Sequence, residues 1–207
     1  NIFKILTNLI GFNRLGGEFM SDDFKKIKVY PGKRAVKYNN PTSYPLIGRG
    51  QSGAVFKLSN NKCVKVFYSS NSARLEAKAL EIGQSSPIIP RLYDTGSKYI
   101  VMEYITGLDL YEYLRLKKEL PDHISKQILY CLKELKKIGF TRLNIHARHF
   151  IVTENEQLRV IDHGHAFKNV EPKPIYLLRK LKKLGVKKDF LNYVKRTEPK
   201  IYKNWMS

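Results

Sequence analysis

Cysteine is scarce in this chain of 207 residues, which contains only Cys63 and Cys131. Two cysteines cannot build a disulfide framework, and neither belongs to a CxxC pair, so they predict a reduced, cytoplasmic protein. Long apolar runs are also missing, because none reaches the roughly 18 residues that a membrane-spanning helix needs. The sequence therefore predicts no transmembrane segment.

Acidic residues are few, with 18 Asp and Glu against 38 Lys and Arg, which gives a net charge of +20. A charge of this size indicates an anionic partner, which can be a nucleotide, a nucleic acid, an acidic protein or a membrane surface. Hydrophobic residues make up 43% of the chain and aromatic residues 12%, and this composition excludes wholesale disorder. The length is sufficient for one domain or two small lobes with a buried core.

The first 19 residues differ from the rest of the chain. They are basic and apolar, but polar residues interrupt Ile2–Phe12 and no small-residue cleavage site follows, which disfavours a signal peptide or an amphipathic anchor. Gly16-Gly17-Glu18 can be encoded by a bacterial ribosome-binding sequence just ahead of Met20. We therefore expect residues 1–19 to be a translated leader or a disordered segment. We expect residues 20–43 to be an N-terminal extension whose polar part, 21–26, frays.

Strands come first and helices later in the rest of the chain. Turn glycines between apolar residues predict a hairpin over 44–58, and further strands are expected at 63–68, 99–104, 150–153 and 158–161. Apolar residues at helical spacing predict helices over 72–82, 108–116 and 122–138. This order predicts an α+β chain in two lobes.

The C-terminal tail is strongly basic. Residues 166–207 hold 12 basic and 3 acidic residues, a net charge of +9. Four leucines line one side of a predicted helix in this tail, at positions 177, 178, 181 and 184. The helix either closes the core and exposes a solvated basic face, or offers that face to an acidic partner or a nucleic acid.

A glycine-rich segment and a lysine are the first candidates for chemistry. Residues 48–55 read GRGQSGAV, and glycines in such a turn allow backbone N–H groups to approach phosphates closely. Lys65 follows within an apolar strand, where a lysine is costly to bury unless a carboxylate or phosphate pairs with it. Glu76 on the next predicted helix is an available partner. The alternative is an edge-strand lysine whose charge reaches water.

These residues resemble the protein kinase-like superfamily, in the form of a small, divergent bacterial serine/threonine-protein kinase, over residues 44–167. The resemblance implies a bilobal kinase-like fold, with a β-rich N-lobe at 44–104 and a truncated helical C-lobe with the basic tail at 105–207. It implies that Lys65 holds ATP and pairs with Glu76, or, as a second candidate, with Glu81. The implied ATP-binding residues are Ile47, Gly48, Arg49, Gly50, Gln51, Ser52, Gly53, Val55, Lys65, Glu76, Met102, Glu103 and Ile105.

The sequence Asp162-His163-Gly164 resembles the metal-binding DFG motif of this superfamily. Counting back by the family's spacing, His149 falls at the metal-binding Asn position, 13 residues before Asp162, and Asn144 at the catalytic Asp position, 18 residues before it. The implied catalytic residues are Asn144, Lys65 and Asp162. The implied metal ligands are Asp162 and His149, for Mg²⁺ or, because imidazole favours softer ions, Mn²⁺.

The resemblance implies ATP-dependent phosphotransfer to Ser or Thr of a protein substrate, which the basic tail would recruit if it is acidic. Asn144 can accept a hydrogen bond but cannot take a proton, so a pseudokinase that binds nucleotide or a partner without turnover stays open. A zinc site is a further alternative, with ligands from His146, His149, His163, His165 and Asp162. Nucleic-acid binding is disfavoured because the sequence has no RNP-like aromatic-basic motif and no clear helix-turn-helix.

Overall fold

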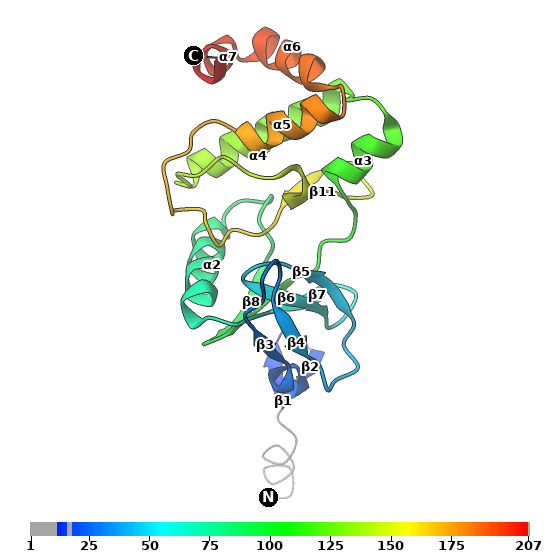
Figure 1. Cartoon of the computed structure of the whole chain (residues 1–207), viewed down its shortest axis with the longest axis vertical. Coiled ribbons are helices and arrows are strands. Elements are labelled where there is room, and N and C mark those ends of the chain that lie inside the picture. The colour runs from blue at the N-terminus through cyan, green and yellow to red at the C-terminus, as the bar shows by residue number, and fades with distance from the viewer. Residues whose placement is uncertain (1–11, 16–17, 207) are drawn as a thin grey trace, which may run out of the picture. The chain divides into compact units, whose positions relative to one another are not determined.

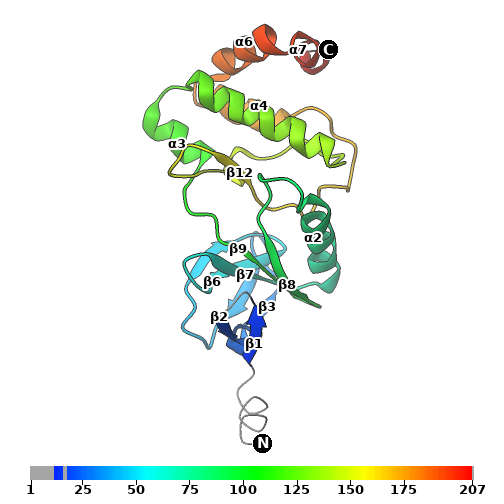
Figure 2. The same ribbon diagram turned by 180° about the vertical axis from the view of Figure 1, so that it is seen from behind.

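The chain divides into two compact units in the computed structural model, which describes residues 12–15 and 18–206 (Figure 1). The first unit comprises the described residues up to Ala77 together with Leu92–Tyr104, and the second comprises Lys78–Arg91 and the described residues from Ile105 onward. The first is rich in strands and the second in helices, as Figure 2 also shows from behind. The predicted α+β, bilobal class is confirmed.

The first unit is built on a five-stranded antiparallel sheet in the order β5-β6-β7-β9-β8. Its strands are β5 (Leu46–Arg49), β6 (Gly53–Lys57), β7 (Lys62–Phe67), β8 (Leu92–Gly96) and β9 (Tyr99–Glu103). The predicted hairpin is β5–β6, and the strands predicted next along the chain are β7 and β9. Side chains alternate between the two faces of a strand, so Ala54 and Phe56 of β6 enter the core while Val55 lies on the opposite face.

Residues 22–39 contribute to the core of this sheet. They form the 3-10 helix η1 (Asp22–Lys26) and the hairpin of β3 (Lys28–Tyr30) and β4 (Lys37–Asn39). Phe24, Ile27 and Val36 are buried in one cluster with apolar residues of β6, β7 and β9. The expectation that 21–26 frays is wrong, because the Phe24 ring packs edge-on against Tyr99 at 5.1 Å between ring centroids.

The predicted leader lies partly outside the described residues. Residues 1–11 and 16–17 are not described, whereas β1 (Phe12–Leu15) and β2 (Glu18–Ser21) pair as antiparallel strands. The interpretation of residues 1–19 as a translated leader stays a prediction.

The second unit combines helices with a small sheet. The helices are α3 (Leu110–Lys117), α4 (Asp122–Lys137), α5 (Ile175–Lys183), α6 (Lys187–Thr197) and α7 (Pro199–Met206), and the antiparallel sheet runs β10 (Leu108–Asp109), β11 (Phe150–Val152), β12 (Leu158–Val160). The predicted helix at 122–138 is α4, which buries Ile124, Ile128, Leu132 and Leu135 on one face. The predicted strand pair is β11–β12. Helix α2 (Ser70–Gly83) contains the helix predicted at 72–82.

The basic tail forms α5, α6 and α7, as the orange and red helices of Figure 1 show. Leu177 and Leu181 of α5 are fully buried, and Phe190 and Val194 of α6 are buried as well. The leucine stripe therefore closes a core, while most lysines of α5 and α6 face solvent. No helix among residues 12–15 and 18–206 is long and apolar enough to cross a membrane.

Both cysteines are unpaired and buried. Burial raises the pKa of the Cys63 thiol, and likewise of the Cys131 thiol, to about 12. A thiol with such a pKa carries almost no thiolate near neutral pH, and the thiolate is the reactive form. Both cysteines are therefore core residues, and their burial disfavours reaction as nucleophiles.

The packing of residues 22–39 against the sheet can be tested at Phe24. Its side chain is only 2% exposed, so Phe24→Ala should lower the free energy of unfolding by about 3–5 kcal/mol, the usual cost of deleting a buried aromatic ring. Urea denaturation of the full chain measures this loss. Tyr30→Ala is the control, because Tyr30 is about half exposed and should change stability far less. Equal effects of the two substitutions would show that Phe24 is not a core residue.

Candidate functional site

Lys65 and Glu76 form a buried ion pair in the first unit. The Lys65 Nζ atom donates to both carboxylate oxygens of Glu76, at 2.8 Å to Oε1 and 2.6 Å to Oε2. The side chains are only 8% and 2% exposed. The lysine comes from the middle of β7 and the glutamate from α2, which starts three residues after β7 ends. The alternative of a lysine that reaches water is therefore wrong, and Glu76 is the partner of Lys65.

Burial of this pair needs a reason beyond stability. Two charges lose their hydration when they are buried, and their attraction compensates only when the geometry is good. Here the lysine bonds both glutamate oxygens, and its Nζ atom also lies 5.2 Å from the centroid of the Phe67 ring. An apolar pair would fill the same space without the desolvation cost. A retained lysine and carboxylate are therefore candidates for binding a charged ligand.

The glycine-rich segment lies next to Lys65 on the same face of the sheet. Val55 is directly opposite Lys65, and Gly53 is directly opposite Phe67; opposite residues of antiparallel strands share a face. A Cβ atom at Gly53 would lie 2.6 Å from the carbonyl oxygen of Val66, so only glycine fits there. The turn between β5 and β6 closes through the Gly50 N–H, which donates to the Gly53 carbonyl at 3.0 Å.

The extension reaches the tip of this turn. The N–H of Val36 donates to the carbonyl of Gly50 at 2.9 Å. The guanidinium of Arg49 lies 6.0 Å from the centroid of the Tyr38 ring, and Tyr38 packs edge-on against Phe56. Residues 36–38 thus hold both the turn and the strand that follows it. The other predicted turn residues include Ile47, Gln51 and Ser52. The Ile47 side chain is exposed.

Met102 and Glu103 lie at the end of β9, and Ile105 lies in the second unit. Met102 is buried directly opposite Cys63, so it shares the face of Lys65. Glu103 lies opposite Lys62 in the register of β7 and β9, and the Glu103 carbonyl oxygen lies 3.7 Å from the Cys63 Sγ atom. The implied role of Glu103 and Ile105 in binding ATP stays a prediction.

Asp162 and His149 come together in the second unit. The His149 Nε2 atom lies 3.4 Å from the Asp162 Oδ2 atom, and the His149 carbonyl accepts a hydrogen bond from the Ile161 N–H at 2.9 Å. His149 ends the 3-10 helix η2 (Ala147–His149). Asp162 has a left-handed backbone with φ of +64°, which is strained for a residue other than glycine. Such strain gathers at functional sites.

The zinc alternative is not supported. Among residues 12–15 and 18–206, no three or more His, Cys, Asp or Glu side chains are arranged to hold a metal ion. His163 is buried against Phe140, and its Nε2 atom lies 2.8 Å from the Val160 carbonyl. His146 instead stacks on the Tyr176 ring at 4.5 Å. Burial, Lys180 and Arg142 lower the pKa of His146.

Asn144 uses both polar atoms of its side chain within the protein. Its Oδ1 accepts from the N–H of Tyr176 at 2.7 Å, which caps the first turn of α5. Its Nδ2 donates to the Glu171 Oε2 atom at 2.6 Å. These two bonds tie the loop around 144 to α5 and to the segment before it. A direct role of Asn144 toward an acceptor hydroxyl stays a prediction.

Glu171 is the functional candidate that sequence reasoning missed. It pairs its backbone with Thr141 and Leu143, and its Oε1 atom lies 3.5 Å from Arg142 Nε. The hydrogen bond from Asn144 and the charge of Arg142 lower the pKa of the Glu171 carboxyl, so it is ionised at neutral pH. Glu171 is the only acidic residue between Asp162 and Asp189, and this isolation in a basic tail is the signal that could have found it.

Comparison with known proteins gives one family and several relatives. The family described as "ABC1 atypical kinase-like domain" matches this chain over residues 70–197. The chain is 34% identical over 122 residues to "Putative serine/threonine-protein kinase YrzF" of Bacillus subtilis (strain 168), covering 56% of this chain and 57% of that protein. It is 30% identical over 146 residues to "Probable serine/threonine-protein kinase SCO3848" of Streptomyces coelicolor, covering 59% and 22%. The chain thus spans little more than half of the first relative and about a fifth of the second.

Exchange of Asn144 tests the hydrogen bonds of its side chain. Asn144→Asp replaces the donor Nδ2 with an oxygen beside the Glu171 carboxylate, so the thermal unfolding midpoint should fall by several degrees. Adding Glu171→Gln to Asn144→Asp swaps amide and carboxylate and should restore the midpoint, because one donor again faces one acceptor. Asn192→Asp, an exposed position on α6, controls for the added charge. An unchanged midpoint for Asn144→Asp alone would contradict the bond to Glu171.

Proposed function

The chain belongs to the ABC1 atypical kinase-like family, and on this basis we propose that it binds ATP with a divalent cation and transfers phosphate to a Ser or Thr hydroxyl of a protein. The two relatives named as serine/threonine-protein kinases support this reaction. The two unpaired thiols support a reducing compartment, and we place the reaction in the cytoplasm.

The buried pair of Lys65 and Glu76 is the observation that carries the proposal. A lysine held by a glutamate keeps its charge in a buried place and is ready to bind phosphate oxygens. Gly53 and Val55, on the same face, lie beside it in the segment whose glycines suit a close approach of phosphates. Lys65 would hold the phosphates, Glu76 would position Lys65, and the turn at residues 47–53 would cover them.

Asp162 and His149 fit a divalent cation. Mg²⁺ binds through one or two protein ligands and takes its other ligands from substrate phosphates and water, so two adjacent side chains are sufficient. The strained backbone of Asp162 is explained if a bound ion holds the carboxylate there. The imidazole of His149 favours Mn²⁺ over Mg²⁺. ATP with its cation would supply the transferable phosphoryl group.

Asn144 and Glu171 would position the acceptor hydroxyl. Asn144 stands where the superfamily has its catalytic carboxylate, and the carboxylate nearest to it is Glu171, at 2.6 Å. We assign Asn144 to positioning Glu171 and the start of α5, and Glu171 to receiving the hydroxyl hydrogen bond. In phosphoryl transfer most of the rate comes from positioning and charge stabilisation, so a displaced carboxylate can be enough.

A pseudokinase that binds ATP without turnover is the second candidate. Asn144 favours it, because both of its polar atoms are used in hydrogen bonds within the protein. The pair of Lys65 and Glu76 would then serve nucleotide binding alone. The two candidates share the nucleotide site and differ only in transfer.

Removal of the buried pair tests nucleotide binding. Lys65→Met alone would leave Glu76 as an unpaired buried charge, at a cost of about 3–5 kcal/mol, so Glu76→Gln is added to it. The double variant should bind ATP with Mg²⁺ or Mn²⁺ tenfold to more than a hundredfold more weakly, since each charge-assisted contact is worth about 1.5–3 kcal/mol. Isothermal titration calorimetry measures the affinity. Lys98→Met, an exposed lysine in the same unit, should bind ATP like the parent; equal binding by the folded double variant would refute the site.

The amide–carboxylate swap separates the two candidates. Asn144→Asp with Glu171→Gln moves the carboxylate to the superfamily's catalytic position without placing two carboxylates side by side. A positioned base in such a loose transition state should raise transfer roughly 10- to 100-fold. Transfer of labelled phosphate from ATP to the chain itself and to casein, an acidic protein, is the measurement. A folded swap variant that binds ATP but, like the parent, transfers nothing would favour the pseudokinase.

A further inference from the structure

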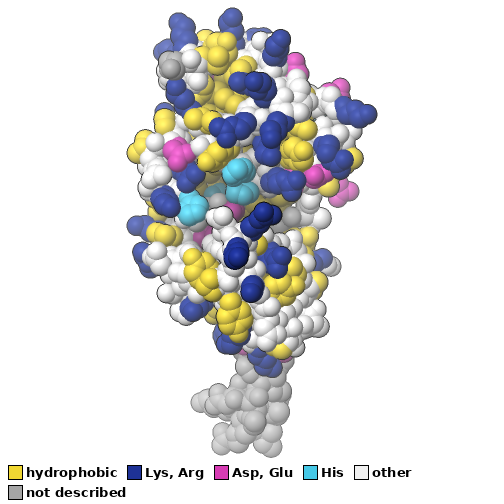
Figure 3. Space-filling model, viewed as in Figure 1, with side chains coloured by type: hydrophobic (Ala, Val, Ile, Leu, Met, Phe, Trp, Pro, Cys, Tyr) yellow, Lys and Arg dark blue, Asp and Glu magenta, His cyan; other side chains and the backbone are white. Residues whose placement is uncertain are grey.

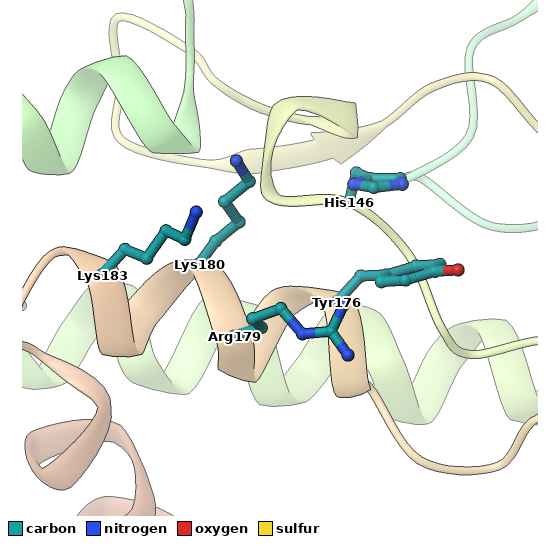
Figure 4. A pocket seen from close by; sticks show the side chains of 5 residues that line it. All are labelled: His146, Tyr176, Arg179, Lys180 and Lys183. Carbon is teal, nitrogen blue, oxygen red and sulfur yellow. The ribbon is translucent and has the colours of Figure 1, made fainter.

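A basic pocket opens beside the loop of Asn144, wholly within the second unit. Its volume is about 250 Å³, and its lining residues are His146, Tyr176, Arg179, Lys180 and Lys183 (Figure 4). Four of them come from α5. In Figure 4 the side chains of Lys180 and Lys183 rise from α5 toward the side of His146, and Arg179 extends along the helix toward Tyr176.

The cations of this pocket have no acidic side chain bound to them in the described part of the chain. Arg179, Lys180 and Lys183 form no ion pair with an Asp or Glu there. Two of them rest on aromatic rings instead: Arg179 lies 5.7 Å from the Tyr176 centroid and Lys180 lies 5.4 Å from the Tyr111 centroid. Figure 3 shows Lys and Arg side chains crowded around histidines on this face of the unit.

Such a cluster is weakly destabilising until an anion occupies it. Three positive charges on one helix face repel one another, and similar repulsion at helical spacing destabilises a helix. Leu177 and Leu181 already hold α5 in the core, so packing does not require the lysines or the arginine. The aromatic contacts fix the direction of two cations in advance of binding, which lowers the entropy cost of gripping a ligand.

We propose that this pocket binds a phosphate monoester, as a phosphoserine or phosphothreonine side chain of the protein acceptor. A phosphate carries a charge of about −1.5 to −2 and three acceptor oxygens at neutral pH, which suits three cations better than one carboxylate does. The planar guanidinium of Arg179 can bind two of these oxygens at once. The volume of about 250 Å³ admits the phosphate and the start of its side chain.

The place of the pocket gives this group its role. Tyr176 lines the pocket, and its backbone N–H is bonded to Asn144, so the pocket adjoins the loop at which the acceptor hydroxyl would lie. The inference therefore rests on the proposed function for the acceptor's identity. Binding of the phosphate itself depends only on residues of α5 and His146. The acceptor would be a protein segment that already carries one phosphate.

Binding of O-phosphoserine to the full chain without ATP tests the pocket. Isothermal titration calorimetry at fixed salt should detect O-phosphoserine and inorganic phosphate, weaker binding of aspartate, and no binding of serine. Lys180→Gln with Lys183→Gln, which keeps most of each side chain, should weaken O-phosphoserine binding about tenfold or more. Lys188→Gln with Lys203→Gln removes the same charge from exposed positions of α6 and α7 and should leave the affinity within twofold.

The outcomes separate this inference from the proposed function. Three results would each overturn the proposed phosphate site. They are unaltered O-phosphoserine binding in the Lys180, Lys183 variant, equal loss of binding in both double variants, and no binding by the parent. The Lys65, Glu76 variant should lose ATP and keep O-phosphoserine, because its substitutions lie in the other unit. If the parent binds O-phosphoserine at α5 but does not bind ATP, the result contradicts the proposed function and supports the phosphate site.

Discussion

The ion pair between Lys65 and Glu76 is the constraint on which the first unit depends. Only Tyr68 and Ser69 separate β7 from α2, so the chain must turn sharply and still bring the two side chains into contact. An apolar pair of similar volume is often as stable as a buried ion pair. We therefore interpret the pair as a way of keeping the Lys65 ammonium away from bulk water and fixed in direction. The charge stays available on the face of the sheet that Gly53 and Val55 share.

The sequence was sufficient where local rules decide the structure. The strand of Lys65 and the helix of Glu76 follow from apolar periodicity, and turn glycines mark the β5–β6 hairpin. The pairing of Lys65 with Glu76 could be predicted because a buried lysine needs a carboxylate and Glu76 is close along the chain. The family's spacing in turn placed His149 and Asp162 at one site, and their side chains do lie 3.4 Å apart.

The sequence was insufficient where contacts join distant residues of ordinary type. Nothing in the polar run at 21–26 shows that Phe24 packs on Tyr99, since one aromatic residue makes no periodic pattern. The bond from Asn144 to Glu171 spans 27 positions, and either residue alone reads as a surface group. Spacing also suggested a histidine cluster, but the backbone turns His163 into the core and His146 onto Tyr176.

The hydrogen bond from Val36 to Gly50 has a consequence for the motion of the glycine turn. The Val36 side chain is fully buried and its N–H is bound to the carbonyl at the tip of that turn, so this amide proton can exchange with solvent only when the segment and the turn separate. The free energy of a local opening of this kind is well below that of global unfolding. The exchange rate of the single amide at Val36 thus reports how often the turn opens, and a ligand that closes the turn slows that exchange without touching Val36.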